Sequence, residues 1–588
     1  MLFSKFVTYL ERLETTSSRL ILIDILAELF TIASKEDIDK IIYLTQGRVA
    51  PFFAPLEIGM ADKTVAETIA RSYASKKEDV LALYNKLGDM GKAAQDLNLE
   101  NRDKNKNLTV ADVFNILIKI ANTNGEGTVE KRIMLLSGLL VEMNGVSARH
   151  LIRIPLGNNR LGIGDPTILD GLALAILGDR SRRKLLEKAY SETSDLGLIG
   201  KTLKTDGLDG VRKLMVRVGC PIRSELCERL PGPEKVFEKM SPNGEGVHAT
   251  PKYDGFRVQI HKNDDDVRMF SRNLEDMTHM FPEIIDGTRK QIMAKTAILD
   301  TEALAYQPES EEFLPFQETT KRRRKHNIAQ MAEQLPLKAF VFDILYINGK
   351  SLLDIPLTER MTILADIVYD GDVLIPAPGK ILYDSSDLQK MLDDSISKGL
   401  EGVVVKRTDS LYEAGGRNFN WVKLKRHSSG ELNDTIDCVV LGYIVGKGKR
   451  AAFGAGALLV GVYDKEKDMF MSVSKIGTGL TDEEWKEIYE RADKLRVDQK
   501  PARVDSVIVP SVWVRPEIVI EILADEITRS PNHTAGKKSA IINGQIESES
   551  GYALRFPRLV TFRSADRRPE DATTVNELIT MYNQQGKK

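Results

Sequence analysis

The spacing of apolar residues changes twice along this chain of 588 residues, and each change limits how the following segment can fold. From residue 1 to about 215, apolar residues recur every three or four positions, as in 110–118 and 132–140, which is typical of helices with one buried face. From about 216 to 427, short β-branched runs alternate with helical stretches and predict a mixed α+β domain. From about 428 onward, short strands separated by turns predict a small β-barrel.

These three patterns of apolar residues predict a multidomain protein with domains at 1–215, 216–427 and 428–588. A chain of this length is expected to form roughly three to five domains. The apolar stretch 20–33 is interrupted by Asp24 and Glu28, so it predicts a buried helix and not a membrane span. We therefore expect no membrane partner.

The net charge of −2 gives no overall basic field of the kind that attracts nucleic acid. This argues only weakly against nucleic acid, because basic residues can gather on one face. Cys220, Cys227 and Cys438 lack the spacing of a disulfide framework or a structural zinc site. Their pattern fits a reducing interior, and we expect a soluble, cytoplasmic protein.

The segment 252–257, with Lys252, Asp254, Gly255 and Arg257, carries the most specific chemistry. Alternating and β-branched residues flank it, so we expect Lys252 on a loop or strand end beside a sheet. A lysine there, with an arginine five residues on, has the chemistry of an amine nucleophile directed at a phosphate. The alternative is a surface hairpin, because Asp-Gly is a common turn signal and lysine is usually solvated.

A P-loop is absent from the sequence. Gly200-Lys201-Thr202 has Asp195 where the leading glycine of that motif should be, and Gly349-Lys350-Ser351 has Ile344 there. Any nucleotide must therefore be bound in another way.

Three acidic residues, Glu302, Asp343 and Glu401, lie in or beside apolar, strand-like runs. A carboxylate in such a run must be paired or bound to a metal, because its desolvation is costly. A buried salt bridge is the alternative for each of them. Two glutamates beside a phosphate-directed lysine also suit Mg²⁺, which binds through carboxylates and substrate phosphates.

Cations gather in the same part of the chain, at Arg272, Arg417, Lys423 and Lys425. In a strand, Lys423 and Lys425 point to the same side, so these residues could converge on a triphosphate. The alternative is an edge strand guarded by lysines.

Taken in order, these elements resemble the ATP-dependent DNA ligases of the archaeal and eukaryotic replicative type. The resemblance covers nearly the whole chain and rests on segments that are weak singly and strong in series. These are 161–170, 252–257, 271–273, 300–302, 340–343, 401–406, 421–425, 555–558 and 569–573. It implies a helical DNA-binding domain, a nucleotidyltransferase domain that carries out adenylation, and an oligonucleotide-binding (OB-fold) barrel.

The resemblance implies that Lys252 takes AMP from ATP, that AMP passes to the 5′-phosphate of a nick, and that the 3′-hydroxyl then displaces AMP. Such an enzyme seals nicks in duplex DNA during replication, repair and recombination, with Mg²⁺ as its ion and Mn²⁺ as a substitute. Because free lysine is mostly protonated at pH 7, burial and nearby cations must depress the Lys252 pKa. The family pattern assigns Arg257 and Glu302 to the ribose, Phe342 to adenine stacking, Arg272 and Arg417 to nucleotide or nick phosphates, Lys423 and Lys425 to the α-phosphate, and Glu302 and Glu401 to the metal.

In the helical domain, the resemblance implies contacts to the duplex from residues near Arg149, Arg153 and Arg160. Contacts of this kind are independent of sequence. The implied partner is nicked double-stranded DNA, bound by a monomer in the prokaryotic cytosol or nucleoid.

Two positions depart from the family pattern. Thr250 stands where the family commonly has a glutamate that reads the adenine amino group, which puts selection of ATP over other nucleotides in doubt. The barrel motif that assists pyrophosphate departure is usually R-x-D-K, whereas here Arg563 and Arg567 enclose three residues and arginine replaces lysine. Arginine and lysine are not interchangeable at such sites.

A sliding clamp is a further candidate partner, because Gln46, Val49, Phe52 and Phe53 have the spacing of a clamp-binding peptide. Similar segments in this family look structural, and we favour that interpretation.

Two other functions are open. RNA ligases and mRNA-capping enzymes share the lysine motif, but capping enzymes lack the long helical domain and RNA ligases rarely carry it. A non-catalytic DNA-binding module would not need Lys252, Glu302, Glu401 and Lys423 together.

Overall fold

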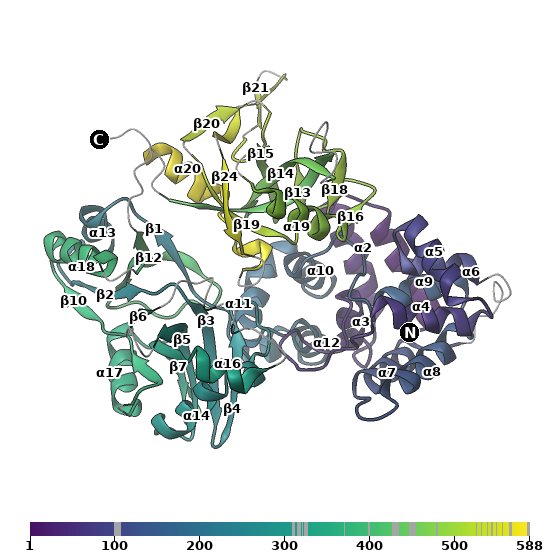
Figure 1. Ribbon diagram of the computed structural model, residues 1–588, viewed down its shortest axis with the longest axis horizontal. Coiled ribbons are helices and arrows are strands. Elements are labelled where there is room, and N and C mark those ends of the chain that lie inside the picture. Colours follow the sequence, from purple (N-terminus) through teal and green to yellow (C-terminus); the bar gives the residue numbers. More distant parts are fainter. Residues whose placement is uncertain are drawn as a thin grey trace. The chain divides into compact units, whose positions relative to one another are not determined.

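The computed structural model describes all residues except 99–106, 308–311, 314–318, 320–321, 323–326, 370, 398–399, 426–433, 446–453, 478–479, 525, 531, 538, 543–544, 549, 556, 564–566 and 585–588. Contacts divide the chain into two compact units, Met1–Met215 and Val216–Lys588. Figure 1 colours the first unit purple to blue and the second teal to yellow.

The first unit is built from helices, as the spacing of its apolar residues predicts. Helices α6 (Met90–Leu97) and α9 (Gly145–Arg153) pack closely because Gly91 lacks a side chain: a Cβ there would lie 2.5 Å from the carbonyl oxygen of Arg149. The other helices are α1 (Phe3–Glu14), α2 (Arg19–Ile32), α3 (Ile38–Thr45), α4 (Asp62–Ser72), α5 (Lys77–Leu87), α7 (Val110–Ala121), α8 (Thr128–Leu140), α10 (Asp165–Leu177), η1 (Arg180–Arg182), α11 (Arg183–Thr193) and α12 (Leu196–Arg212).

The second unit begins with two β-sheets. The first sheet has the order β1-β12-β11-β2-β10, and the second has the order β4-β3-β5-β7-β8, with β6 and β9 alongside. The strands of the first sheet are β1 (Leu226–Arg229), β2 (Val247–Lys252), β10 (Lys380–Leu382), β11 (Gly402–Arg407) and β12 (Arg417–Lys425). Those of the second are β3 (Phe256–Asn263), β4 (Asp266–Ser271), β5 (Thr296–Gln307), β6 (Glu312–Phe313), β7 (Leu337–Ile347), β8 (Lys350–Ser351) and β9 (Leu374–Pro376).

Helices cover one face of each sheet. Helices α13 (Pro233–Met240) and α18 (Ser385–Ser397) bury the apolar face of the first sheet, and α14 (Pro282–Gln291), α16 (Ile328–Gln334) and α17 (Leu357–Ile367) contribute to the core of the second. A separate apolar cluster joins residues of both sheets, among them Ile298 and Leu345 of the second and Trp421 of the first. The two sheets therefore face each other across shared contacts.

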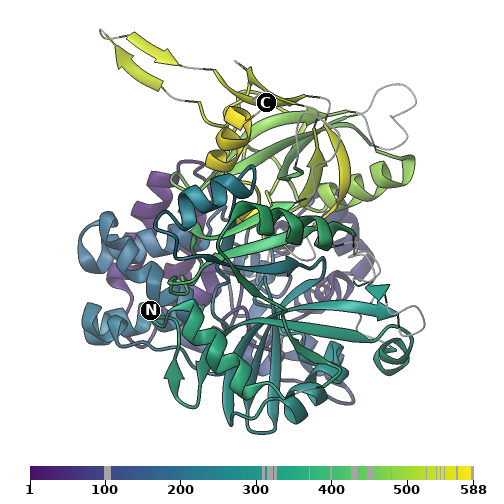
Figure 2. The ribbon, with the colours of Figure 1, turned by 90° about the vertical axis from the view of Figure 1, so that its left-hand side faces the viewer.

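The C-terminal part of this unit is rich in strands, as predicted. Its main sheet contains β16 (Arg496–Val497), β18 (Val512–Val514), β13 (Ile436–Val445), β14 (Ala455–Asp464), β15 (Met469–Ile476) and β17 (Val504–Asp505), with β19 (Val519–Leu523) and β24 (Arg558–Phe562). The pairs β20 (Glu526–Ser530) with β23 (Gly551–Arg555) and β21 (Ser539–Ile542) with β22 (Gln545–Ser548) extend from it in Figure 2. Helices α19 (Asp482–Asp493) and α20 (Val575–Gln584) and the turn η4 (Pro569–Asp571) complete it.

The division into three domains stays a prediction, because 216–588 form one unit by their contacts. Among the described residues, no helix is long and apolar enough to cross a membrane.

Candidate active site

Lys252 is the last residue of β2, at the point where the chain leaves one sheet for the other. Strand β2 pairs with β10 and β11, whereas β3, which starts at Phe256, pairs with β4 and β5. The Asp254-Gly255 pair therefore lies in a connection between two sheets, and the hairpin alternative is wrong. A Cβ at Gly255 would lie 2.3 Å from the carbonyl oxygen of Ala303, so this connection requires glycine.

Strand alternation gathers the reactive residues of the first sheet on one face. In β2, Val247 and Ala249 join the core beneath α13 and α18, so Thr250 and Lys252 lie on the opposite face. In β11 and β12 the same alternation buries the intervening valines and leucine. The residues it places on the face of Lys252 are Val404, Lys406, Trp421, Lys423 and Lys425.

A pocket opens on this face, and every residue predicted for the site except Lys425 lines it. Lys425 lies next to the pocket, with its Nζ 3.4 Å from Glu401 Oε2. Residues 564–566, between the two predicted barrel arginines, lie outside the described residues. The predicted residues that line the pocket are Thr250, Lys252, Arg257, Arg272, Glu302, Phe342, Glu401, Arg417, Lys423, Arg563 and Arg567.

Carboxylates, and not cations, dominate the surroundings of Lys252. Its Nζ lies 2.5 Å from Glu401 Oε2. Burial lowers the pKa of the Lys252 ammonium, but Glu401, Glu302 and Asp254 outweigh burial and raise that pKa above its ordinary value. The expectation that nearby cations depress this pKa is therefore wrong for this structure, which holds Lys252 as a protonated, paired ammonium.

The two glutamates predicted to bind a metal reach the same pocket in different electrostatic states. Burial raises the pKa of the Glu302 carboxyl to about 7, and its Oε1 accepts a hydrogen bond of 3.2 Å from the amide of Gly255. Burial also acts to raise the pKa of Glu401, but Lys252 and Lys425 outweigh it and hold that pKa well below the usual range. A divalent cation suits such a pair, because it would stabilise the ionised form of Glu302.

Asp343 forms a buried salt bridge, which was the alternative to metal binding for this residue. Its carboxylate contacts Arg360, with Nε 2.7 Å from Oδ1, and Lys406, with Nζ 3.3 Å from Oδ2. Lys406 also donates a 2.9 Å hydrogen bond to the carbonyl oxygen of Phe342 and lies 3.7 Å from the centre of the Trp421 ring. These contacts fix the backbone and aromatic neighbours of Phe342 at the pocket wall.

Arg257 is held by groups of both sheets. Its Nε and Nη2 contact the two carboxylate oxygens of Asp300 at 3.0 and 2.6 Å, and its Nη1 donates to the carbonyl oxygen of Glu225 at 2.6 Å. Burial acts against the charged guanidinium, but Asp300 outweighs it and raises the Arg257 pKa. Arg257 therefore stays charged at the base of the pocket.

The other predicted arginines are paired with carboxylates. Two of these carboxylates, Asp571 and Glu577, belong to the last 20 residues, so the C-terminal segment contacts arginines that line the pocket. The pairs are Arg417 with Glu577, Arg272 with Asp571 at 3.6 Å, Arg563 with Glu521 at 3.5 Å and Arg567 with Asp437.

Lys423 has a different environment. Burial is the largest cause that lowers its pKa, and Arg229, which lies opposite it in β1, and Lys425 add to the effect. The pKa of Lys423 is therefore well below that of a free lysine, and an incoming phosphate would favour its protonation.

The chain was compared with known protein families and curated proteins. It matches the model described as DNA ligase N terminus over residues 2–173, the ATP dependent DNA ligase domain over 224–425, and the ATP dependent DNA ligase C terminal region over 451–566. It is 44% identical over its full length to a probable DNA ligase of Dictyoglomus turgidum, of which it covers 98%. The chain belongs to the ATP-dependent DNA ligases. It is also 40% identical to DNA ligase 2 of Thermofilum pendens and 37% identical to a DNA ligase of Sulfolobus acidocaldarius, over the whole chain and over 98% and 99% of those proteins.

Sequence reasoning about this ligase missed several residues at the site. Asp571 and Glu577 pair with pocket arginines from the far end of the chain, and Arg360 supports Asp343 from a helix. Asp571 lies in 569–573, one of the segments that carry the resemblance, but no role was expected of it; no local pattern marks Glu577 or Arg360, because each is an ordinary charged residue in a helix. Tyr412, which contacts Asp300 and Arg257, lies in a loop without a motif.

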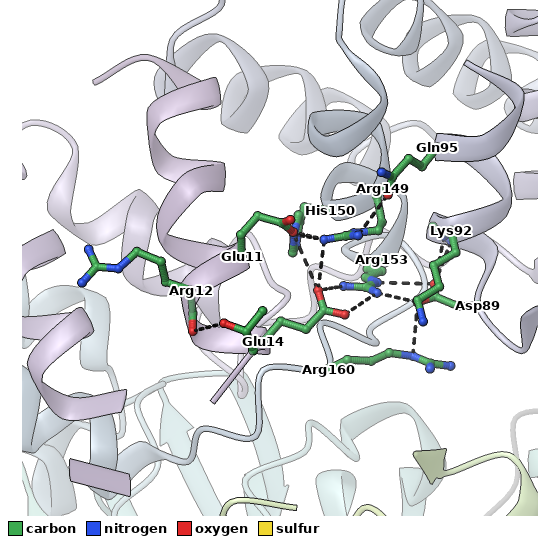
Figure 3. Close-up of polar contacts among 12 residues, drawn as sticks. Glu11, Arg12, Glu14, Asp89, Lys92, Gln95, Arg149, His150, Arg153 and Arg160 are labelled. Atoms are coloured by element: carbon green, nitrogen blue, oxygen red, sulfur yellow. Dashed lines mark hydrogen bonds and ion pairs between the residues drawn. The ribbon is translucent and has the colours of Figure 1, made fainter. Parts of the chain in front are cut away.

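In the first unit of the ligase, the arginines expected near DNA belong to an ion-pair network (Figure 3). Arg153 is 2% exposed, contacts Glu14 at 2.7 and 2.9 Å, and pairs with Asp89. Arg149 pairs with Glu11, and Arg160 lies 3.8 Å from Asp89. Arg153 therefore joins α1 to α9 and to the start of α6, and a DNA contact by its side chain is excluded in this arrangement.

The same network contains Glu11, Glu14 and His150, which form the one group of three or more His, Cys, Asp or Glu side chains among the described residues whose ligand atoms lie within 4.8 Å of one another. Burial and the neighbouring arginines lower the pKa of His150 to about 3, so its ring is neutral. Arg149 and Arg153 already neutralise both glutamates. We therefore interpret this group as a structural ion-pair cluster.

Three of the four motif residues in the segment that resembles a clamp-binding peptide make internal contacts. Gln46 donates a 3.1 Å hydrogen bond to Asp165 Oδ1, and Val49 and Phe53 are buried. Phe52 is 38% exposed, and the guanidinium carbon of Arg48 lies 4.0 Å from the centre of the Phe52 ring. These contacts support the structural interpretation.

Proposed function

We propose that this chain seals nicks in duplex DNA with ATP, through an AMP group carried by Lys252, in replication, repair and recombination. The position of Lys252 supports this most directly. It ends a strand at the connection between two sheets, inside a pocket that also contains cations for phosphates and carboxylates for a metal. Membership of the ATP-dependent DNA ligases supports the same reaction, since nick sealing through an adenylate is the general function of that family.

The reaction proceeds in three transfers at phosphorus. The lone pair of Lys252 Nζ bonds to the α-phosphorus of ATP, the bond to the bridging oxygen breaks, and pyrophosphate leaves. An oxygen of the 5′-phosphate at the nick then bonds to that phosphorus, and Lys252 leaves as an amine that takes up a proton. The 3′-hydroxyl next bonds to the 5′-phosphorus and loses its proton, and AMP leaves.

Positioning and electrostatics supply most of the acceleration in such transfers. We assign Lys423 and Lys425 to the α-phosphate, Arg257 to the ribose side, and Arg272 and Arg417 to nucleotide or nick phosphates. Arg272 and Arg417 are each paired with a carboxylate in this structure. These ion pairs must separate when the phosphates bind. Arg563 and Arg567 would orient the departing pyrophosphate as planar, always charged donors.

The part of the pocket that we assign to the adenine base contains an aromatic side chain, Phe342, and a hydroxyl group, that of Thr250. We assign Phe342 to stacking on adenine. Thr250 is 4% exposed and pairs with Val404 across β2 and β11. A hydroxyl both donates and accepts, so Thr250 can serve the amino group of adenine or the carbonyl of guanine. We therefore expect weaker selection of ATP over GTP than a glutamate at this position would give.

We also propose that Glu302 and Glu401 hold Mg²⁺, with Mn²⁺ as a substitute. The residues fit, because Glu302 is a buried carboxyl with a raised pKa and Glu401 is a carboxylate in the same pocket. When bound, the ion would neutralise phosphate charge and polarise the α-phosphate. Lys252 must lose its proton before attack, and its partner Glu401 is the group whose charge holds that proton.

The proposed partner is nicked double-stranded DNA, bound by a monomer through sequence-independent backbone contacts. We propose that the strand-rich part acts as an oligonucleotide-binding barrel, and that the enzyme works in the prokaryotic cytosol or nucleoid. A sliding clamp is a further proposed partner, but we do not assign its binding to 46–53, because Val49 and Phe53 are buried and Gln46 contacts Asp165.

Incubation with α-labelled ATP and Mg²⁺, followed by denaturation, tests the function. We expect the wild type to retain label and Lys252→Ala to retain none. Absence of label on the wild type would contradict the proposal. Sealing of nicked DNA is then compared with sealing of nicked RNA, and a preference for RNA would favour the RNA ligase alternative.

A further inference from the structure

A tyrosine hydroxyl outside the predicted site joins the two sheets beneath Arg257. Tyr412 lies in the loop between β11 and β12 and is 3% exposed. Its Oη donates a 2.9 Å hydrogen bond to Asp300 Oδ2 and accepts one of 3.1 Å from the amide of Glu225. Asp300 belongs to β5 of the second sheet, and Glu225 directly precedes β1 of the first. One hydroxyl group therefore ties together both walls of the pocket.

The same hydroxyl completes the set of acceptors around Arg257. A guanidinium has five N–H groups. Asp300 takes two, the carbonyl oxygen of Glu225 takes one, and Tyr412 Oη lies 3.4 Å from Nη2. Within the described part of the chain, these contacts leave one N–H of Nη1 for an acceptor on a ligand. The orientation of that single donor depends on how firmly the other four are held.

The hydroxyl of Tyr412 is itself fully used. It has one hydrogen to donate and two lone pairs, and Asp300, Glu225 and Arg257 engage all three. Burial and Asp300 raise the Tyr412 pKa well above its ordinary value, so the group stays a donor. Its ring packs edge-on against Trp421, with ring centres 5.7 Å apart, and a phenylalanine would keep that contact.

We propose that Tyr412 is a positioning residue for nucleotide binding. Its hydroxyl fixes Asp300 and Arg257 so that the remaining N–H of Arg257 is aimed at an oxygen of the bound nucleotide. Tyr412 does not line the pocket, so it acts through Arg257 and not by its own contact. This role rests on the proposed use of ATP.

Substitution Tyr412→Phe removes the hydroxyl and keeps the ring. The full-length enzyme is first freed of AMP with pyrophosphate, and the Kd for α,β-methylene-ATP, which cannot transfer AMP, is measured by calorimetry. We expect Tyr412→Phe to raise this Kd about tenfold, the effect of one displaced polar contact. In an Arg257→Met background we expect the same substitution to change the Kd less than twofold, because the group it positions is gone.

A matched control separates positioning from general loss of stability. Tyr463→Phe also removes a buried hydroxyl that donates to a carboxylate, Asp468, at 2.9 Å, but it lies in β14 of the strand-rich part. We expect Tyr463→Phe to lower the melting temperature and leave the Kd unchanged.

An unchanged Kd in Tyr412→Phe would overturn the role of Tyr412, as would an equal increase with and without Arg257. Failure of the wild type to bind the analogue and to form an AMP adduct with ATP would instead overturn the proposed use of ATP. The two failures are thus distinguishable.

Discussion

Replacing Arg360 with methionine should weaken the central sheets more than the loss of an ordinary ion pair. Arg360 and Asp343 have fully buried side chains, joined by contacts of 2.7 and 3.1 Å. Arg360 also donates to the carbonyl oxygens of Ile355 and Ser410. Methionine retains much of the apolar volume but leaves Asp343 with Lys406 as its remaining basic partner. Breaking a buried pair on one side costs about 3–5 kcal/mol when the remaining charge has no partner; because Lys406 still compensates Asp343, we expect a loss near the lower end, about 3 kcal/mol.

Hydrogen exchange of the β7 and α17 amides in the full-length enzyme is the appropriate assay, since a protein of several domains need not unfold in one step. Arg407→Met is the control. Arg407 pairs with Asp409 at 2.9 Å, but the two side chains are 32% and 61% exposed, and such pairs contribute about 1 kcal/mol or less. If the free energy of opening of β7 falls no further in Arg360→Met than in Arg407→Met, the argument from burial is refuted.

The pH dependence of the same variant provides a second check. Burial would raise the pKa of the Asp343 carboxyl, but Arg360 and Lys406 outweigh burial and hold it below its ordinary value. A carboxyl with a depressed folded pKa stabilises the protein above its unfolded pKa, and that stability is lost as the pH falls through the folded pKa. Without Arg360 the folded pKa rises, so Arg360→Met should lose this contribution at a higher pH than the wild type.

Three further predictions concern charge. Glu577→Gln should remove the ion pair with Arg417 and keep a polar side chain at the start of α20. We expect this variant to bind nicked DNA more tightly in a filter-binding assay. Unchanged binding would contradict competition between Glu577 and phosphate for Arg417. Burial raises the pKa of Glu225 to about 8, so the wild type should lose stability as the pH rises from about 5 to 8, and Glu225→Gln should lack this loss in thermal unfolding. Nick sealing should weaken steeply from low to moderate salt, because phosphate contacts dominate affinity, and a flat response would contradict binding by the basic residues.

The order of the domain types could be predicted because it depends on local patterns. Helical spacing marks the first unit, and alternation in β2, β11 and β12 predicts which side chains share a face. Lys423 and Lys425 lie on the face of Lys252 for that reason. Such inferences need only the period of a strand and the position of its apolar residues.

The partners of the charged residues could not be predicted, because pairing depends on tertiary contacts between distant segments. Arg153 and Arg360 have no local feature that distinguishes them from solvent-exposed arginines, yet both are buried against carboxylates. Asp254-Gly255 is a frequent hairpin signal, and only the assignment of β2 and β3 to different sheets shows that no hairpin forms. A short motif thus indicates Lys252 as the candidate nucleophile without revealing its surroundings.

Those surroundings bear on how Lys252 could serve as the proposed nucleophile and still be protected in the absence of substrate. An unpaired amine in a pocket open to nucleotides would react with other electrophiles, whereas an ammonium 2.5 Å from Glu401 is not nucleophilic. In the proposed mechanism, Glu401 and Glu302 would raise the Lys252 pKa less if they held a metal ion, because the charge of the ion would offset theirs. Arg417 and Arg272 are likewise paired with Glu577 and Asp571, with which a phosphate would have to compete in the proposed mechanism. In the proposed mechanism, compensation of these carboxylates would therefore lower the Lys252 pKa, and the proton that leaves the ammonium would pass to solvent before the amine attacks.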